Sequence, residues 1–129
     1  MIGGRVLDLS ALLSFAEQSS VYAAALVWTA VEEDIVLLAP SSAISLAWSR
    51  LDPATEPVLE VLVGLPNVVV DDLTRARSRE IGEWLRGQTA RLDIAHAAVC
   101  AVQRGWPIVT AEPTAYVGAP TDLVIEPLL

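Results

Sequence analysis

The chain has 129 residues, 53 % of them hydrophobic, which excludes a disordered protein and suits one domain, 1–129, with one sizeable core. The formal net charge is −8, and all eight basic residues are arginine. An acidic surface disfavours broad, nonspecific binding to nucleic acid, which depends on neutralising phosphates. A small, metal-bridged contact with RNA and a basic partner protein both stay compatible with this charge.

Segments that would place the protein in a membrane or outside the cell are not visible in the sequence. No uninterrupted apolar run reaches the length of a membrane span, and no export signal is seen at the N-terminus. We therefore expect a cytoplasmic protein with no membrane contact. The single cysteine, Cys100, lies among alanines and valines and is expected to be a buried packing residue.

Strand-like and helix-like patterns alternate along the chain. Strands are predicted at 5–7, 35–39, 68–70 and 107–110, with a fifth at an edge, 123–125. Helices are predicted at 11–18, 21–33, 42–51, 53–63, 74–86 and 92–104. This alternation predicts an α/β fold, a three-layer α/β/α sandwich around a mostly parallel sheet of four or five strands.

Local signals set several helix boundaries. Ser10, Ser20 and Asp52 are predicted N-caps, because their side-chain oxygens can accept a hydrogen bond from the first helical turn. Pro53 follows Asp52 at the position that proline favours in a helix, and Gly105 stands where the last long helix should stop.

Three acids are expected at one edge of the sheet. Asp8 ends the first strand, Asp93 lies in the first turn of a helix, and Glu112 follows the fourth strand. The carboxyl ends of parallel strands meet at one edge, where open α/β folds collect their ligands. Clustered carboxylates are ligands for Mg²⁺ or Mn²⁺, which can activate water in phosphoryl chemistry. We therefore predict that Asp8, Asp93 and Glu112 are metal ligands and catalytic residues.

Three segments of the chain resemble the PIN-domain family, whose best-known small members are ribonuclease toxins of VapBC toxin–antitoxin pairs. The segments are 6–12, with Asp8 and Ser10, 95–98, and 104–113, which is similar to a Gly-x-Pro-hydrophobic-hydrophobic-Thr-x-Asp pattern. The resemblance covers nearly the whole chain. It implies a metal-dependent endoribonuclease with RNA as substrate, an antitoxin protein as partner, and a homodimer.

The chain departs from the family pattern at three acidic positions, and Asp8 keeps to it. Leu46 stands where the family usually has a glutamate, and its helix contains no acid. Asp93 is about one residue out of register, with Ile94 at the more usual distance from Gly105. Glu112 replaces the usual aspartate, which keeps the charge and lengthens the reach. These departures predict a degenerate site.

Two hypotheses follow from this resemblance and its gaps. In the first, the protein is the toxin component of a VapBC-type pair, a Mg²⁺- or Mn²⁺-dependent ribonuclease with weakened activity. In the second, it is a catalytically inactive PIN-like domain that binds a protein partner. A general α/β ligand-binding domain fits less well, because no glycine-rich phosphate loop is present.

Other side chains with functional potential have simpler expected roles. His96 falls on an alanine-rich helix face and is expected to be a hydrogen-bonded packing residue. The early helices carry more bulky groups than a three-layer fold can bury, which predicts an exposed apolar patch and a homodimer formed through them. These groups are Val27, Trp28, Leu46 and Trp48.

Overall fold

The computed structural model describes residues 3–119 and 122–128, and its centre is a five-stranded parallel sheet. The strands run in the order β3-β2-β1-β4-β5. Their bounds are β1 (Gly4–Leu7), β2 (Val36–Pro40), β3 (Val68–Asp71), β4 (Ile108–Thr110) and β5 (Ile125–Pro127). The predicted α/β class is confirmed, and every strand pair is parallel.

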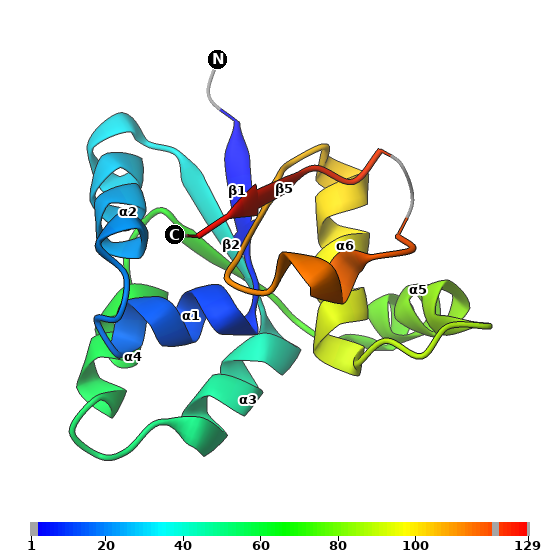
Figure 1. Ribbon diagram of the computed structural model, residues 1–129, viewed down its shortest axis with the longest axis horizontal. Helices are drawn as coiled ribbons and strands as arrows, with labels where there is room; N and C mark the ends of the chain where they lie inside the picture. The colour runs from blue at the N-terminus through cyan, green and yellow to red at the C-terminus, as the bar shows by residue number, and fades with distance from the viewer. Residues whose placement is uncertain (1–2, 120–121, 129) are drawn as a thin grey trace.

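Helices cover both faces of the sheet (Figure 1). They are α1 (Leu9–Ala16), α2 (Val21–Glu33), α3 (Ser41–Arg50), α4 (Glu56–Val63), α5 (Arg75–Leu85) and α6 (Leu92–Arg104), with a short 3-10 helix, η1 (Pro113–Tyr116). Helices α1, α2 and α4 lie on one side, and α6 with α5 on the other. None of the helices in the described ranges is long and apolar enough to cross a membrane.

The core has two main parts because strand side chains alternate between the two faces of the sheet. Leu7 and Val109 belong to the cluster under α1, whereas their neighbours Val6 and Ile108 belong to the cluster under α6. Burying one such side chain fully contributes about 1.5–3 kcal/mol. Burial on both faces explains why adjacent residues in these strands, such as Val6 and Leu7, are both apolar.

Two long helices were predicted with their observed bounds. Helix α2 begins after Ser20, whose hydroxyl oxygen accepts the Ala23 N–H at 3.1 Å. Helix α6 ends at Gly105, which has φ +67°, a left-handed conformation that favours glycine. Both ends depend on local chemistry, which explains why they could be read from sequence.

Two predicted N-caps are wrong. Helix α1 begins at Leu9, and its N-cap is Asp8, whose Oδ1 accepts the Ala11 N–H at 3.0 Å, so Ser10 lies inside the helix. Asp52 folds a turn instead of starting a helix, because its carboxylate accepts the N–H groups of residues 54 and 55 at 2.9 and 3.1 Å. Helix α4 therefore begins only at Glu56.

Helix α3 positions the candidate site. It follows β2 without a loop and contacts α1 on one side and α6 on the other (Figure 1). It therefore lies at the carboxyl ends of the strands, where Asp8 also lies. The residues that α3 presents to α6 thus line the region in which the sequence predicts a site.

The tryptophans have different surroundings. Trp106 packs against the core under α6, and a Cβ atom at Gly4 would lie 2.5 Å from its ring, so glycine is required there. Trp48 is half-buried against the cluster under α1. Trp28 is 69 % exposed on α2. Trp106 therefore covers the core, and Trp28 remains open to solvent.

Candidate functional site

Asp8 is a buried acid whose oxygens are held by the protein itself. The residue is only 1 % exposed. Oδ1 accepts hydrogen bonds from the Ser10 hydroxyl at 2.7 Å and the Ala11 N–H at 3.0 Å, and Oδ2 accepts one from the Tyr116 hydroxyl at 2.8 Å. Burial and the negative charge of Asp8 raise the pKa of Tyr116, so this hydroxyl stays a donor.

Ser10 joins the end of β1 to the end of β4. Its hydroxyl lies 3.1 Å from the Thr110 hydroxyl and accepts the Ala111 N–H at 2.8 Å. The Thr110 hydroxyl oxygen in turn accepts the Glu112 N–H at 2.9 Å. Because β1 and β4 are parallel neighbours, these bonds place Asp8 and Glu112 at the same edge of the sheet.

Asp93 is as buried as Asp8, and its partner is Arg91. The residue is 1 % exposed, although it is displaced by one position from the expected register. The Arg91 guanidinium donates to both carboxylate oxygens, at 3.1 and 3.3 Å. Arg91 is the N-cap of α6 and has an extended backbone, φ −68° and ψ 154°, and its side chain reaches the first turn of the helix.

Glu112 completes the group from the other side of Arg91. Its Oε2 lies 3.7 Å from Nη1 of Arg91, and its side chain is 44 % exposed. The hydrogen bond that Arg91 donates to Asp93 raises the pKa of Arg91, and the negative charges of Asp93, Glu112 and Asp8 act in the same direction. All three predicted acids therefore act on one arginine, which sequence reasoning missed.

The buried carboxylates already have protein partners, so a divalent ion would have to compete with them. Mg²⁺ needs oxygen ligands with free lone pairs in near-octahedral geometry, and it usually retains several waters. Both oxygens of Asp8 already accept protein hydrogen bonds, and both oxygens of Asp93 face a guanidinium. The cation in this group of acids is Arg91.

A cavity of about 540 Å³ opens beside Asp93. Its lining consists of three leucines, two serines, two arginines and one aspartate, namely Ser42, Ser45, Leu46, Arg50, Leu73, Arg91, Leu92 and Asp93. Leu46 therefore faces the region where the family pattern has a glutamate. Helix α3 contributes no carboxylate there, since its sequence contains none.

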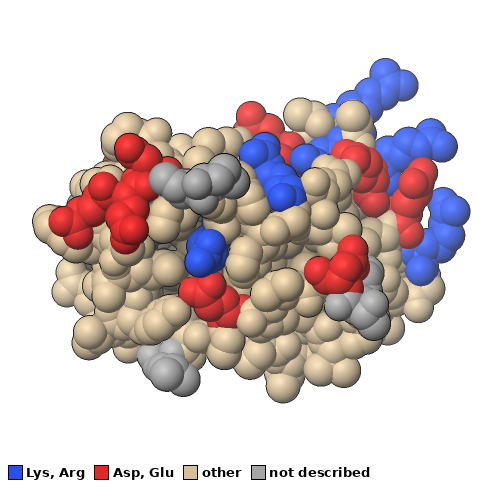
Figure 2. Space-filling view, turned by 90° about the horizontal axis from the view of Figure 1, so that it is seen from above, with Lys and Arg blue, Asp and Glu red and all other residues tan. Residues whose placement is uncertain are grey.

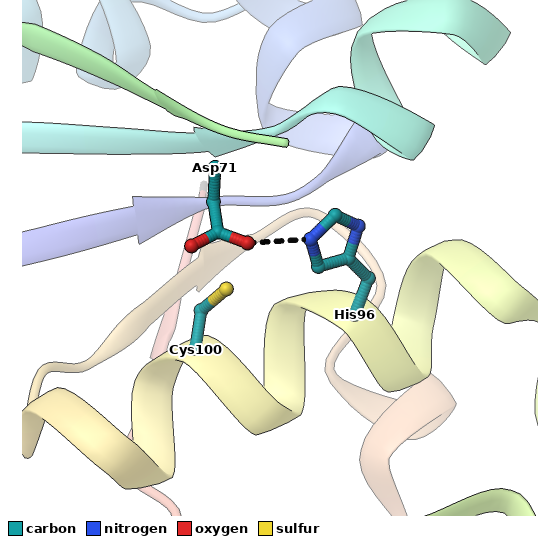
Figure 3. A group of neighbouring side chains, drawn as sticks. All are labelled: Asp71, His96 and Cys100. Carbon is teal, nitrogen blue, oxygen red and sulfur yellow. Dashed lines mark hydrogen bonds and ion pairs between the residues drawn. The ribbon is translucent and has the colours of Figure 1, made fainter. Parts of the chain in front are cut away.

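A second polar cluster lies deeper between α6 and the end of β3, and Figure 3 shows its three labelled members, Asp71, His96 and Cys100. His96 is fully buried; its Nε2 lies 2.8 Å from Oδ1 of Asp71 and its Nδ1 2.7 Å from the Ser42 hydroxyl. A carboxylate only accepts, so Nε2 carries the hydrogen, and in the neutral ring Nδ1 accepts from Ser42. His96 is thus the hydrogen-bonded packing residue that the sequence predicts.

The same cluster has ligand atoms of a transition-metal site within 4.8 Å of one another, but its contacts oppose a metal. Arg77 donates to both oxygens of Asp71, at 2.9 and 3.0 Å. Burial raises the pKa of Cys100 to about 12, so the sulfur is a thiol in the metal-free protein. The cluster is a structural link between β3, α3, α5 and α6.

Charged side chains are unevenly distributed over the face seen in Figure 2. In Figure 2 the basic side chains gather toward the end of the molecule that carries α5, and a group of acidic ones lies toward the end that carries α2. Arg77, the central arginine of α5, is mostly buried with Asp71 and Glu80. Arg77 is thus engaged by acids of the protein itself.

Comparison with known proteins identifies the fold as PIN-like. The chain is similar to VapBC2 from Rickettsia felis, bound in that structure to a DNA fragment from its promoter, with 13 % identity, full coverage of both chains and a TM-score of 0.74. It is similar to PAE2754 from Pyrobaculum aerophilum, with 20 % identity, 95 % and 83 % coverage and a TM-score of 0.59.

A third similar structure is FitAcB from Neisseria gonorrhoeae, with 15 % identity, 94 % and 95 % coverage and a TM-score of 0.56. No family model and no curated protein matches the sequence. At these identities the similarity establishes the fold. Any activity has to be argued from the residues of this chain.

Proposed function

We propose that this protein is the PIN-like member of a toxin–antitoxin type pair and that it acts mainly by binding its protein partner. The fold shared with VapBC2 and FitAcB supports the first part. The second part rests on one observation: the carboxylates of the predicted site already bond to protein groups, and α3 adds Leu46 instead of an acid.

Metal-dependent cleavage of RNA by the natural chain should therefore be weak or undetectable. The proposed site lacks the acid that the family pattern supplies from α3, and each electrostatic contributor of this kind is typically worth on the order of 10²-fold in rate. Any residual cleavage with Mg²⁺ or Mn²⁺ would depend on Asp8, Asp93 and Glu112.

A cleavage assay with a labelled single-stranded RNA in Mn²⁺ tests this part. We expect little cleavage by the natural protein and a gain in Leu46→Glu, which adds a carboxylate to the cavity. Ser49→Glu is the matched control, because Ser49 is exposed on the same helix outside the cavity lining. Robust metal-dependent cleavage by the natural protein, lost in Asp8→Asn, would refute the proposal.

Helix α2 is the proposed interaction surface. It exposes Val21 at 88 % and Trp28 at 69 %, seven residues apart and thus on one helix face. Val27 is buried, and Leu46 and Trp48 are half-buried, so only part of the predicted patch is exposed. Exposed apolar patches usually mark interfaces, and we propose that α2 carries the homodimer contact or the antitoxin contact.

Light scattering at micromolar concentration, with and without a co-expressed antitoxin, tests this surface. A dimer or a stable complex that Trp28→Glu disrupts would support it. A monomer that also fails to bind the co-expressed protein would remove the basis for a partner-binding role.

A further inference from the structure

The acidic group at the sheet edge contains its own cation. Arg91 donates to both oxygens of Asp93 and lies 3.7 Å from Glu112. Asp8 also acts on it through its charge. A guanidinium in this position satisfies the same electrostatic need as a bound metal, because it balances carboxylates that have lost their water.

Burial makes this balance necessary. Asp93 is 1 % exposed, and an ionised carboxylate removed from water without a partner costs several kcal/mol. Arg91 provides a planar guanidinium whose donors match both carboxylate oxygens of Asp93. Without Arg91, a single metal ion would have to contact these oxygens. Glu112 is half in solvent, so water already screens its charge.

We propose that Arg91 takes the place of the divalent metal in this PIN-like site and that metal binds tightly only when Arg91 is removed. This inference rests on the proposed function, since it explains why the acids of a PIN-like fold would not support metal-dependent chemistry. The acids that could bind a metal are present, and one further residue, Arg91, opposes metal binding.

The direction of the effect follows from charge. With Arg91 in place, the buried carboxylates of Asp8 and Asp93 present one uncompensated negative charge to a metal. Without Arg91 they present two. The incoming ion must also break two hydrogen bonds between Arg91 and Asp93. Removing a cation a few ångströms from a divalent ion changes affinity by at least about tenfold, even with the strong screening near a protein surface.

Electron paramagnetic resonance of Mn²⁺ tests the inference, because the sharp signal of free Mn²⁺ is lost when the ion binds. We expect weak binding to the natural protein and binding at least about tenfold tighter to Arg91→Gln. Arg50→Gln is the matched control, since it removes the same charge from the lining of the same cavity and leaves the Arg91–Asp93 pair intact. Arg91→Lys keeps the positive charge and should still bind Mn²⁺ weakly.

Thermal unfolding gives a second readout that needs no activity. Mn²⁺ should raise the melting temperature of Arg91→Gln by binding the native state, and the added change Asp93→Asn should abolish the rise. If Arg91→Gln does not fold without metal, the inference requires Mn²⁺ to restore folding. Failure to restore it, or equal Mn²⁺ binding by the natural protein and Arg91→Gln, would overturn the role of Arg91.

The two proposals can fail separately. Metal-dependent RNA cleavage by the natural protein would overturn the proposed function, whatever Arg91→Gln binds. Equal metal binding with and without Arg91 would overturn this inference and leave the partner-binding role to its own test.

Discussion

Replacing Asp8 should show that this acid is structural in the protein as it folds. In Asp8→Ala the N-cap of α1 is lost, which costs about 1 kcal/mol. The buried Tyr116 hydroxyl also loses its acceptor, and an unsatisfied buried donor costs about 1–3 kcal/mol. The free energy of unfolding should therefore fall by about 3 kcal/mol.

A fall of this size is easy to measure by thermal denaturation. For a chain of this length, 1 kcal/mol corresponds to a shift of roughly 3–5 °C, so Asp8→Ala should melt roughly 9–15 °C below the natural protein. Asp8→Asn should lose less than Asp8→Ala, because the amide oxygen can still accept the Ala11 N–H and the amide nitrogen can donate to the Tyr116 oxygen. Glu112→Ala, an exposed control, should stay within about 0.5 kcal/mol.

A double-mutant cycle isolates the contact that matters most. Asp8→Ala and Tyr116→Phe share one hydrogen bond, so the double variant should lose less than the sum of the two single losses. If Asp8→Ala is as stable as the natural protein, or more stable, Asp8 is a destabilising functional acid and the structural reasoning is wrong.

Three further experiments probe other parts of the molecule. Cys100, with its pKa raised to about 12 by burial, should resist maleimide at pH 8 in the native state and react fully in denaturant. Burial alone would raise the pKa of Asp71, but hydrogen bonds from Arg77 and His96 lower it below 3.8, so its stabilisation is present above pH 4 and lost as pH falls further. Asp71→Asn should therefore flatten the loss of stability below pH 4 in acid titrations followed by circular dichroism. Trp28→Glu should change the free energy of unfolding by less than about 0.5 kcal/mol, because its side chain is mostly in solvent.

Helix α6 shows what the sequence could predict. Its apolar face, its first residue and its stop at Gly105 all depend on residues within the helix or next to it. The order of strands and helices likewise predicted the parallel sheet, because short connections and right-handed crossovers leave few alternatives. Local and topological rules were sufficient for the fold.

The candidate site depended on contacts that are distant in sequence. Asp8 and Tyr116 are 108 residues apart, and His96 and Asp71 are 25 apart. Strand β3 continues one residue past its predicted end and so brings Asp71 to His96. The periodicity of the sequence predicts which face of a helix or strand a residue occupies. It does not predict which side chain from another element will form its hydrogen bond.

Arg91 shows the same limit at short range. It stands two residues before Asp93, a spacing at which helical side chains do not face each other. The contact forms because Arg91 precedes the helix with an extended backbone and a side chain long enough to reach the first turn. The only sequence signal was a long cation next to a predicted metal ligand at a helix start.

The buried Asp93 and the partly buried Asp71 are each neutralised by an arginine. Asp93 pairs with Arg91, and Asp71 pairs with Arg77, each through two hydrogen bonds. Arginine suits this task better than lysine, because its planar fork binds both oxygens and is less strongly hydrated. All the basic residues of this chain are arginine. A group of buried carboxylates therefore indicates a metal site only where the chain does not itself supply the cation, and at Asp93 it does.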